Sequence, residues 1–192
     1  LLYWAVQDVA TQQAVAGPGL HQETNPAVRT FGQWTSVIDA GALGEAYLLS
    51  TSQGDSVTLA FSGSGVILHT RLAPAGATLY VTLDGYPVSA LPRDATGQSY
   101  VALSAAEADG HTQVPLVEGL HPSEHTLRLT VGPGADGGDS GTRCAIDAFT
   151  VGEVADQRFP WWQLALIAAG VAVGIWLLVL SLRRLRWIMP RI

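Results

Sequence analysis

Two histidines four residues apart, His121 and His125, have a spacing that can bind a metal ion. On a helix this spacing places both imidazoles on one face, where zinc is bound well. Pro122 stands between them, however, and an alternating apolar run follows at 125–131, and both features disfavour a helix. We therefore predict that segment 121–125 is a turn into a strand rather than a metal site.

A second group of chemistry-bearing residues is the glycine-rich acidic stretch at 134–141, which contains Asp136 and Asp139. Calcium takes about six to eight oxygen ligands, including several carboxylates in a fixed geometry. Two carboxylates are too few alone, although Asp147 would add a third if its strand passed nearby. The sequence favours a solvent-exposed loop, with calcium binding as the alternative.

Catalysis has little support in the residue pattern. The sequence contains no G-x-S-x-G, H-E-x-x-H or phosphate-loop motif. Ser64, His69 and Asp84 do not indicate a catalytic triad, because any chain of this length contains a serine, a histidine and an aspartate. Cys144 is the only cysteine, which excludes an intrachain disulfide and cysteine-rich metal sites. It stands near Ile146 in a candidate strand, so we interpret it as a small core residue. The sequence predicts a protein that is not an enzyme and binds no cofactor.

Sugar binding would need exposed aromatic rings beside hydrogen-bonding side chains. Two aromatic residues are candidates for such a contact: Trp34, at the start of the strand-forming region, and Tyr86, at the tip of a predicted hairpin. Tyr80 alternates with Leu79 and Val81, and a tyrosine on an outer strand face is often there for its strand propensity alone. A glycan contact at Trp34 or Tyr86 is therefore a hypothesis that needs further support.

The C-terminal region contains 22 consecutive residues without a charge, at 161–182. A helix of that length spans roughly 30 Å, the thickness of the hydrocarbon core of a bilayer. We predict a single transmembrane helix here. Gly170 and Gly174 would form a groove on it that lets a partner helix approach closely, either in a homodimer or in a larger membrane protein.

The charges on either side of this segment predict its orientation. Arginines follow it and acidic residues precede it, which places the tail 183–192 in the cytoplasm and residues 1–160 outside the plasma membrane. Residues 1–160 contain 6 arginines and 16 acidic residues, a net charge of −10, which disfavours nucleic acid as a partner. The predicted anchors at the lipid bilayer interface are Trp161, Trp162, Trp187, Arg183, Arg184 and Arg186.

The region from about 34 to 151 has the pattern of β-strands throughout. Asp84-Gly85 between two of them predicts a tight hairpin. About eight or nine short strands at this spacing indicate a mainly β fold, an antiparallel sandwich of jelly-roll or immunoglobulin-like type. The strand candidates are 56–61, 65–72, 78–83 and 125–131, with weaker ones at 36–40, 46–51, 99–104 and 143–151.

Four segments in this region resemble the galactose-binding-like jelly-roll domains. They are GDSVTLAFSGSGVILHT (54–70), TLYVTLDG (78–85), GLHPSEHTLRLTV (119–131) and RCAIDAFTV (143–151). The resemblance covers about 34–152 and implies a jelly-roll β-sandwich. Such modules are attached to many carbohydrate-active and cell-surface proteins and also serve as adhesion or spacer domains, so the resemblance implies no single function.

The main functional hypothesis from the sequence is a non-catalytic accessory subunit of a larger bacterial membrane complex, for example an energy-transducing or electron-transport complex, which it would brace on the extracytoplasmic side. The alternative is a membrane-anchored carbohydrate-binding or adhesion module, and a third hypothesis is the sensory ectodomain of a signalling partner. The predicted parts are an N-terminal arm (1–33, a short helix and an irregular segment, or the end of a signal or anchor), the sandwich (34–152), a linker (153–160), the transmembrane helix (161–182) and a basic tail (183–192).

Overall fold

The computed structural model describes residues 13–121, 123–134 and 142–153, all within one compact unit. Twelve β-strands and one short 3-10 helix, η1 (Leu43–Glu45), lie in these ranges. The strands are β1 (Gly19–Gln22), β2 (Val28–Phe31), β3 (Thr35–Ile38), β4 (Ala46–Ser50), β5 (Ser56–Ser62), β6 (Val66–Leu72), β7 (Ala77–Leu83), β8 (Tyr86–Pro87), β9 (Tyr100–Ala102), β10 (Asp109–Val117), β11 (Glu124–Gly134) and β12 (Cys144–Val151).

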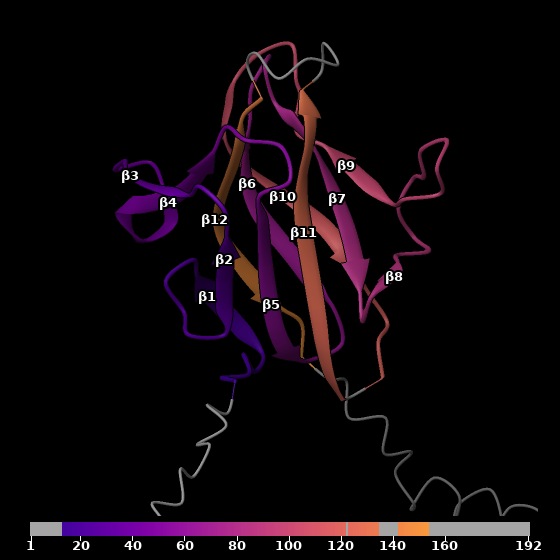
Figure 1. Ribbon diagram of the computed structural model, residues 1–192. Coiled ribbons are helices and arrows are strands. Elements are labelled where there is room, and N and C mark those ends of the chain that lie inside the picture. Colours follow the sequence, from indigo (N-terminus) through magenta and orange to yellow (C-terminus); the bar gives the residue numbers. More distant parts are fainter. Residues whose placement is uncertain (1–12, 122, 135–141, 154–192) are drawn as a thin grey trace, which may run out of the picture. The chain divides into compact units, whose positions relative to one another are not determined.

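The strands form two antiparallel sheets, which pack against each other (Figure 1). Sheet I has the order β10–β6–β12–β4–β3, and β1 also pairs with β12. Sheet II has the order β2–β5–β11–β7–β8, and β9 also pairs with β7. The predicted mainly β, antiparallel sandwich is confirmed for the part of the chain that the structure describes.

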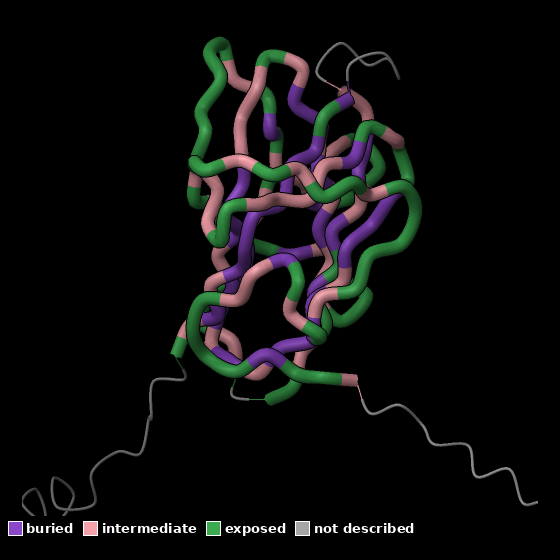
Figure 2. Tube along the Cα trace, turned by 90° about the vertical axis from the view of Figure 1, so that its left-hand side faces the viewer, coloured by how far each residue is buried: buried purple, intermediate pink, exposed green. Residues whose placement is uncertain are grey.

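The core lies between the two sheets and consists of the apolar faces that the alternation predicts. On β5, Val57, Leu59 and Phe61 are at most 1% exposed. The inward residues of β6, β7 and β11 join the same apolar cluster. Figure 2 shows this arrangement as buried stretches along the inner strands and exposed residues on the surrounding loops.

The segment 19–31 corrects the predicted N-terminal arm. β1 pairs with residues 148–151 of β12, and β2 pairs with residues 56–59 of β5, so both belong to the sandwich. The expected irregular segment is wrong here because two four-residue strands, GLHQ and VRTF, are too short and too polar to show alternation. Residues 1–12, with most of the predicted first helix, lie outside the described residues.

Two further local features agree with the sequence. Asp84 and Gly85, between β7 and β8, have φ angles of 51° and 83°, as a type I′ hairpin turn requires. Cys144 is completely buried at the start of β12, and this burial raises the pKa of its thiol to about 12. The hairpin and the core position of Cys144 are therefore confirmed.

A bulge in β12 decides which of its side chains face the core. The register with β6 shifts between Ile146 and Ala148, so one extra residue is accommodated there. Ile146 and Phe149 consequently both belong to the core although they are three positions apart. Asp147 is directed away from that core, and its carboxylate accepts a hydrogen bond from the Leu43 N–H at 3.0 Å.

Within the described ranges, no helix is long and apolar enough to span a membrane. The predicted transmembrane helix at 161–182 lies outside these ranges, together with the basic tail, all of the linker after Glu153 and the acidic residues Asp136 and Asp139. Gly170, Gly174 and the tryptophan and arginine anchors belong to the same undescribed part, so these expectations stay predictions.

Candidate binding site on the outer face of sheet I

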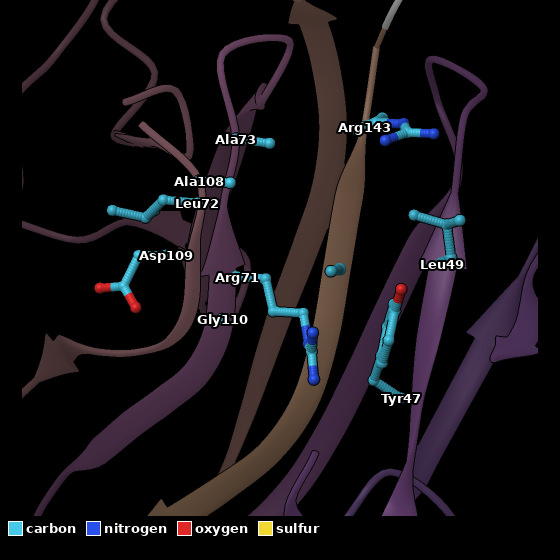
Figure 3. A pocket seen from close by; sticks show the side chains of 10 residues that line it. Tyr47, Leu49, Arg71, Leu72, Ala73, Ala108, Asp109, Gly110 and Arg143 are labelled. Carbon is cyan, nitrogen blue, oxygen red and sulfur yellow. The ribbon is translucent and has the colours of Figure 1, made fainter. Parts of the chain in front are cut away.

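A hollow of about 200 Å³ lies on the outer face of sheet I, over β4, β6, β12 and the start of β10 (Figure 3). The larger residues that line it are Tyr47, Leu49, Arg71, Leu72, Asp109 and Arg143, and the small ones are Ala73, Ala108, Gly110 and Ala145.

Strand register and alternation bring these residues together. Leu49 on β4 stands directly opposite Ala145 on β12. Leu48 packs against the core, so its neighbours Tyr47 and Leu49 face outward. Because Ala145 and Gly110 have little or no side chain, the space between the larger residues stays open.

Arg71 extends across the sheet from β6, as Figure 3 shows. Its Cζ atom lies 4.4 Å from the centre of the Tyr47 ring, and its Nη1 donates to Oδ2 of Asp39 at 2.9 Å. A cation–π contact and an ion pair together hold the guanidinium in one orientation. Its Nε and Nη2 are buried and have no hydrogen-bond partner within the described residues.

The two other charged residues of the hollow differ in how their charges are used. Asp109 accepts hydrogen bonds from Oγ1 of Thr112 (2.7 Å) and from the His111 N–H (3.1 Å), which hold the pKa of its carboxyl below the ordinary 3.8. Arg143 is exposed, and its guanidinium forms no hydrogen bond or ion pair with any residue in the described ranges. The hollow therefore presents one cationic group that no described residue engages.

The same face of sheet I carries a cluster of polar side chains, of which Asp147 and His69 are buried. Asp147 has no exposed surface, and the oxygen that accepts from Leu43 lies 4.0 Å from Nδ1 of His111. Nε2 of His69 lies 2.7 Å from Oγ1 of Thr150, and the rings of His69 and His111 are 5.4 Å apart. The cluster thus joins η1, β6, β10 and β12.

Five buried side-chain atoms in the described residues have no hydrogen-bond partner, and all five belong to strands of sheet I. They are Oε1 of Gln22, Nδ1 of His69, Nε and Nη2 of Arg71, and Oδ1 of Asp147. A buried polar group without a partner costs roughly 1–3 kcal/mol. Buried polar atoms without a hydrogen-bond partner are expected mainly at functional sites. Their concentration in sheet I therefore marks its outer face as the candidate site.

Burial shifts the pKa of His69 and of Glu23, a buried residue after β1 whose charge interacts with that of Asp147. It raises the pKa of Glu23 above 4.5, and the charge of Asp147 adds to the effect. It lowers the pKa of His69 below 6.5, and His111 lowers it further, which favours the neutral imidazole. Within the described ranges, no three histidine, cysteine or acidic side chains are placed to hold a metal ion. The face is suited to hydrogen bonding with a polar ligand.

Trp34 and Tyr86, the two candidate glycan contacts from the sequence, lie at the edges of different sheets. Trp34 is half-buried before β3 at the edge of sheet I, where it packs against the core and donates to the Phe31 carbonyl at 3.2 Å. Tyr86 is 76% exposed on β8 at the edge of sheet II, beside a separate hollow of about 190 Å³ that Val117 and Leu120 also line. Neither residue lines the hollow of Figure 3.

Sequence reasoning missed the residues that the hollow does contain. A signal existed for Arg71, because alternation in 65–72 places it with His69 on the face opposite the core. Tyr47 and Arg143 carried no comparable signal. Their proximity depends on the pairing of β4 with β12, which joins residues far apart in the sequence.

A second polar cluster lies at the turn into β11. Oγ of Ser123 is 2.9 Å from Nε2 of His125, whose Nδ1 is 2.8 Å from Oδ2 of Asp84, in the order of a nucleophile, a base and an acid. Nε2 is also 3.1 Å from the His121 carbonyl oxygen, which can only accept a hydrogen bond. We therefore interpret His125 as a charged link between this turn and Asp84. The predicted turn into a strand is confirmed, since β11 begins at Glu124.

We expect the His125–Asp84 pair to stabilise the fold mainly between about pH 4 and pH 6.5. Burial lowers the pKa of His125, but hydrogen bonds to Asp84 and the His121 carbonyl raise it above 6.5 overall, so its contribution is lost as the pH rises through the raised value. Burial raises the pKa of Asp84, but hydrogen bonds from the Thr126 N–H and His125 lower it below 3.8 overall, so its contribution is lost as the pH falls.

A double-mutant cycle with His125→Asn and Asp84→Asn measures this pair by thermal unfolding. Asparagine at position 84 retains an oxygen that can accept from the Thr126 N–H, so the substitution removes the charge and the hydrogen bond with His125 but keeps the backbone contact. The coupling energy should be larger at about pH 5.5 than at about pH 8.5. Equal coupling at both pH values would contradict a charged link.

Several solved structures of carbohydrate-active proteins contain a similar fold. A two-domain esterase (CEX) active on acetylated mannans, co-crystallized with mannopentaose, matches 72% of this chain and 37% of its own length, with a TM-score of 0.51 and 16% identity. A xanthan lyase from Paenibacillus matches 74% of this chain and 14% of its own, with a TM-score of 0.51 and 13% identity. A family two carbohydrate esterase from Cellvibrio japonicus matches 69% of this chain and 32% of its own, with a TM-score of 0.49 and 15% identity.

At these identities the likeness shows the fold alone. The chain spans about a third of the length of the two esterases. No protein-family model and no curated protein matches the sequence. The chain is thus an antiparallel β-sandwich whose fold also occurs in carbohydrate-active proteins.

Proposed function

We propose that the chain is a non-catalytic carbohydrate-binding module, which holds a glycan in the hollow on the outer face of sheet I. The observation that carries this proposal is the composition of the hollow, where the Tyr47 ring, the Arg71 and Arg143 guanidiniums and several small residues line one space. Small polar molecules are bound in this way, by an aromatic or apolar surface with a few fixed polar groups.

The size of the hollow supports a ligand of about one sugar ring. Its volume of about 200 Å³ is below the roughly 300–1,000 Å³ of clefts that enclose drug-sized ligands. Because it lies on the face of a sheet, further rings of a longer glycan can extend along the strands. The similar sandwiches in an esterase active on acetylated mannans and in a xanthan lyase support a polysaccharide as the class of ligand.

We expect Ala145→Leu to weaken glycan binding at least tenfold, because the leucine side chain would fill the floor of the hollow without removing a polar group. The full chain in mild detergent is first tested on a glycan array, and its affinity for the best ligand is then measured by calorimetry. The matched control is Ala102→Leu, an exposed position on β9 in sheet II, which should leave the affinity unchanged.

Two results would overturn this proposal. Absence of binding by the unchanged chain across a broad array would contradict a carbohydrate-binding function. Loss of binding in Tyr86→Ala but not in Ala145→Leu would place the glycan at the β7–β8 hairpin, the position that the sequence offered, and would contradict the site on sheet I.

Membrane attachment and membership of a larger complex stay predictions, because they rest on residues 161–182. We expect the full chain, extracted from native membranes in mild detergent, to migrate on a native gel with larger membrane proteins. The variant Gly170→Leu/Gly174→Leu should release it, since leucine would fill the groove between the two glycines. Migration of the unchanged chain near 20–40 kDa, the monomer or dimer of a 20.2 kDa chain, would contradict the accessory-subunit hypothesis.

A further inference from the structure

We infer that the hollow selects acidic saccharides, and that the Arg143 guanidinium binds the oxyanion of the sugar. This inference rests on the proposed carbohydrate-binding function and adds the chemical class of the ligand. The oxyanion is the carboxylate of a uronic acid or a sulfate ester, since a guanidinium recognises both through paired N–H groups.

The position of Arg143 supports this role. Its backbone is fixed on both sides, because its N–H donates to the Ala75 carbonyl at 3.1 Å and its own carbonyl accepts from the Ala77 N–H at 2.8 Å. Cys144, the next residue, is completely buried. The side chain nevertheless stays exposed at the hollow, without a partner among the described residues. A fixed backbone, with a guanidinium that no described residue engages, suits recognition of a ligand.

Arg71 adds a second positive charge to the same space. One nitrogen of its guanidinium is bound to Asp39, and two further nitrogens are buried without an acceptor in the part of the chain that the structure describes. Asp39 and the ring of Tyr47 prevent this guanidinium from turning away. Its hydrogen-bonding capacity is therefore only partly used.

The domain is acidic overall, so a hollow lined by two arginines differs from the average charge of the chain around it. Residues 1–160 contain 6 arginines against 16 acidic residues, yet two of these arginines line one small hollow. Asp109, the one acidic lining residue, uses its carboxylate on Thr112 and on the His111 N–H, and Figure 3 shows it directed away from Arg71. A ligand with a negative charge is favoured at this place and repelled by most of the remaining surface.

The experiment compares three oligosaccharides of similar length on the full chain in mild detergent, by calorimetry at low and high salt. They are neutral mannopentaose, an oligogalacturonate and a sulfated oligosaccharide. We expect an acidic ligand to bind about tenfold more tightly than the neutral one, as for a charge-assisted hydrogen bond in place of a neutral one. The two acidic ligands then distinguish a carboxylate site from a sulfate site.

The variant Arg143→Gln should remove this preference and leave the affinity for the neutral ligand nearly unchanged. Salt provides a second readout: it should weaken acidic-ligand binding by the unchanged chain more than binding by Arg143→Gln, because the variant has lost one of the two arginines of the hollow. Arg93→Gln, an exposed arginine outside the hollow, is the matched control and should behave like the unchanged chain.

Each contrary outcome has a distinct meaning. Equal affinity for the neutral and both acidic ligands would overturn the inference and leave the proposed function intact. A preference for acidic ligands that persists in Arg143→Gln would show that the oxyanion binds elsewhere, which also overturns it. Failure of all three ligands, and of every glycan on the array, would overturn the proposed function itself.

Discussion

Replacement of Gly76 by alanine is expected to lower the free energy of unfolding by at least about 3 kcal/mol. A Cβ atom at this position would lie 2.0 Å from the backbone oxygen of Leu103 and 2.7 Å from the backbone nitrogen of Ser104. These are main-chain atoms, so no change of rotamer can relieve the overlap. The turn before β7 and the segment after β9 would have to move apart.

The position of Gly76 also links this substitution to the candidate site. The turn before β7 meets the segment after β9 through the hydrogen bonds Ala73 N–H to Leu103 O (3.2 Å) and Leu103 N–H to Ala77 O (2.9 Å). The same turn holds the backbone of Arg143 through Ala75 and Ala77. Gly76→Ala should therefore disturb the hollow as well as the fold, and glycan binding should weaken even where the protein is still folded.

Thermal unfolding of the full chain in mild detergent, followed by circular dichroism, measures the effect. A loss of about 3 kcal/mol corresponds to a fall in Tm of roughly 6–12 °C for a chain of this size. The matched control is Gly17→Ala, where no atom lies within 4 Å of the added Cβ, so the change should stay below about 1 kcal/mol. A similar Tm for both variants would contradict the close approach of the backbones at Gly76.

The sequence predicts the sandwich well where a strand is long and has one apolar face. The sets Val57, Leu59, Phe61 and Leu127, Leu129, Val131 are both buried as expected, because period-two alternation reports directly on a half-buried strand. It misses β10, which contains Pro115, Gly110 and several exposed polar residues. A proline is tolerated there because β10 is the edge strand of sheet I.

The candidate site is less predictable because it depends on pairing between distant strands. Alternation can place Arg71 on an outer face, but it cannot show that Tyr47 will lie beside it. The contact between Leu43 and Asp147 joins residues 104 positions apart. The direction of Asp147 depends in addition on a bulge, which shifts the alternation of β12 by one residue and has no clear sequence signal.

Replacement of Phe149 by alanine is expected to cost about 3–5 kcal/mol, the usual range for removing a fully buried phenylalanine. The full chain in mild detergent is again followed by thermal unfolding. The matched control is Phe31→Ala on β2, where the side chain is 55% exposed, and there the cost should stay below about 1 kcal/mol. Against a total stability of roughly 5–15 kcal/mol for a domain, the difference between the two variants is large.

This comparison also tests the geometry of the site, because the bulge decides which face of β12 each residue occupies. In a strand without a bulge, side chains alternate strictly, so Cys144, Ile146 and Ala148 would face the core. Phe149 would then lie on the outer face with Ala145 and Asp147. The bulge instead returns Phe149 to the core and leaves Asp147 on the outer side. A cost for Phe149→Ala no larger than that for Phe31→Ala would contradict the bulge. The buried cluster around Asp147 would then lose its structural basis, whereas Ala145, before the shift, would still form the floor of the hollow.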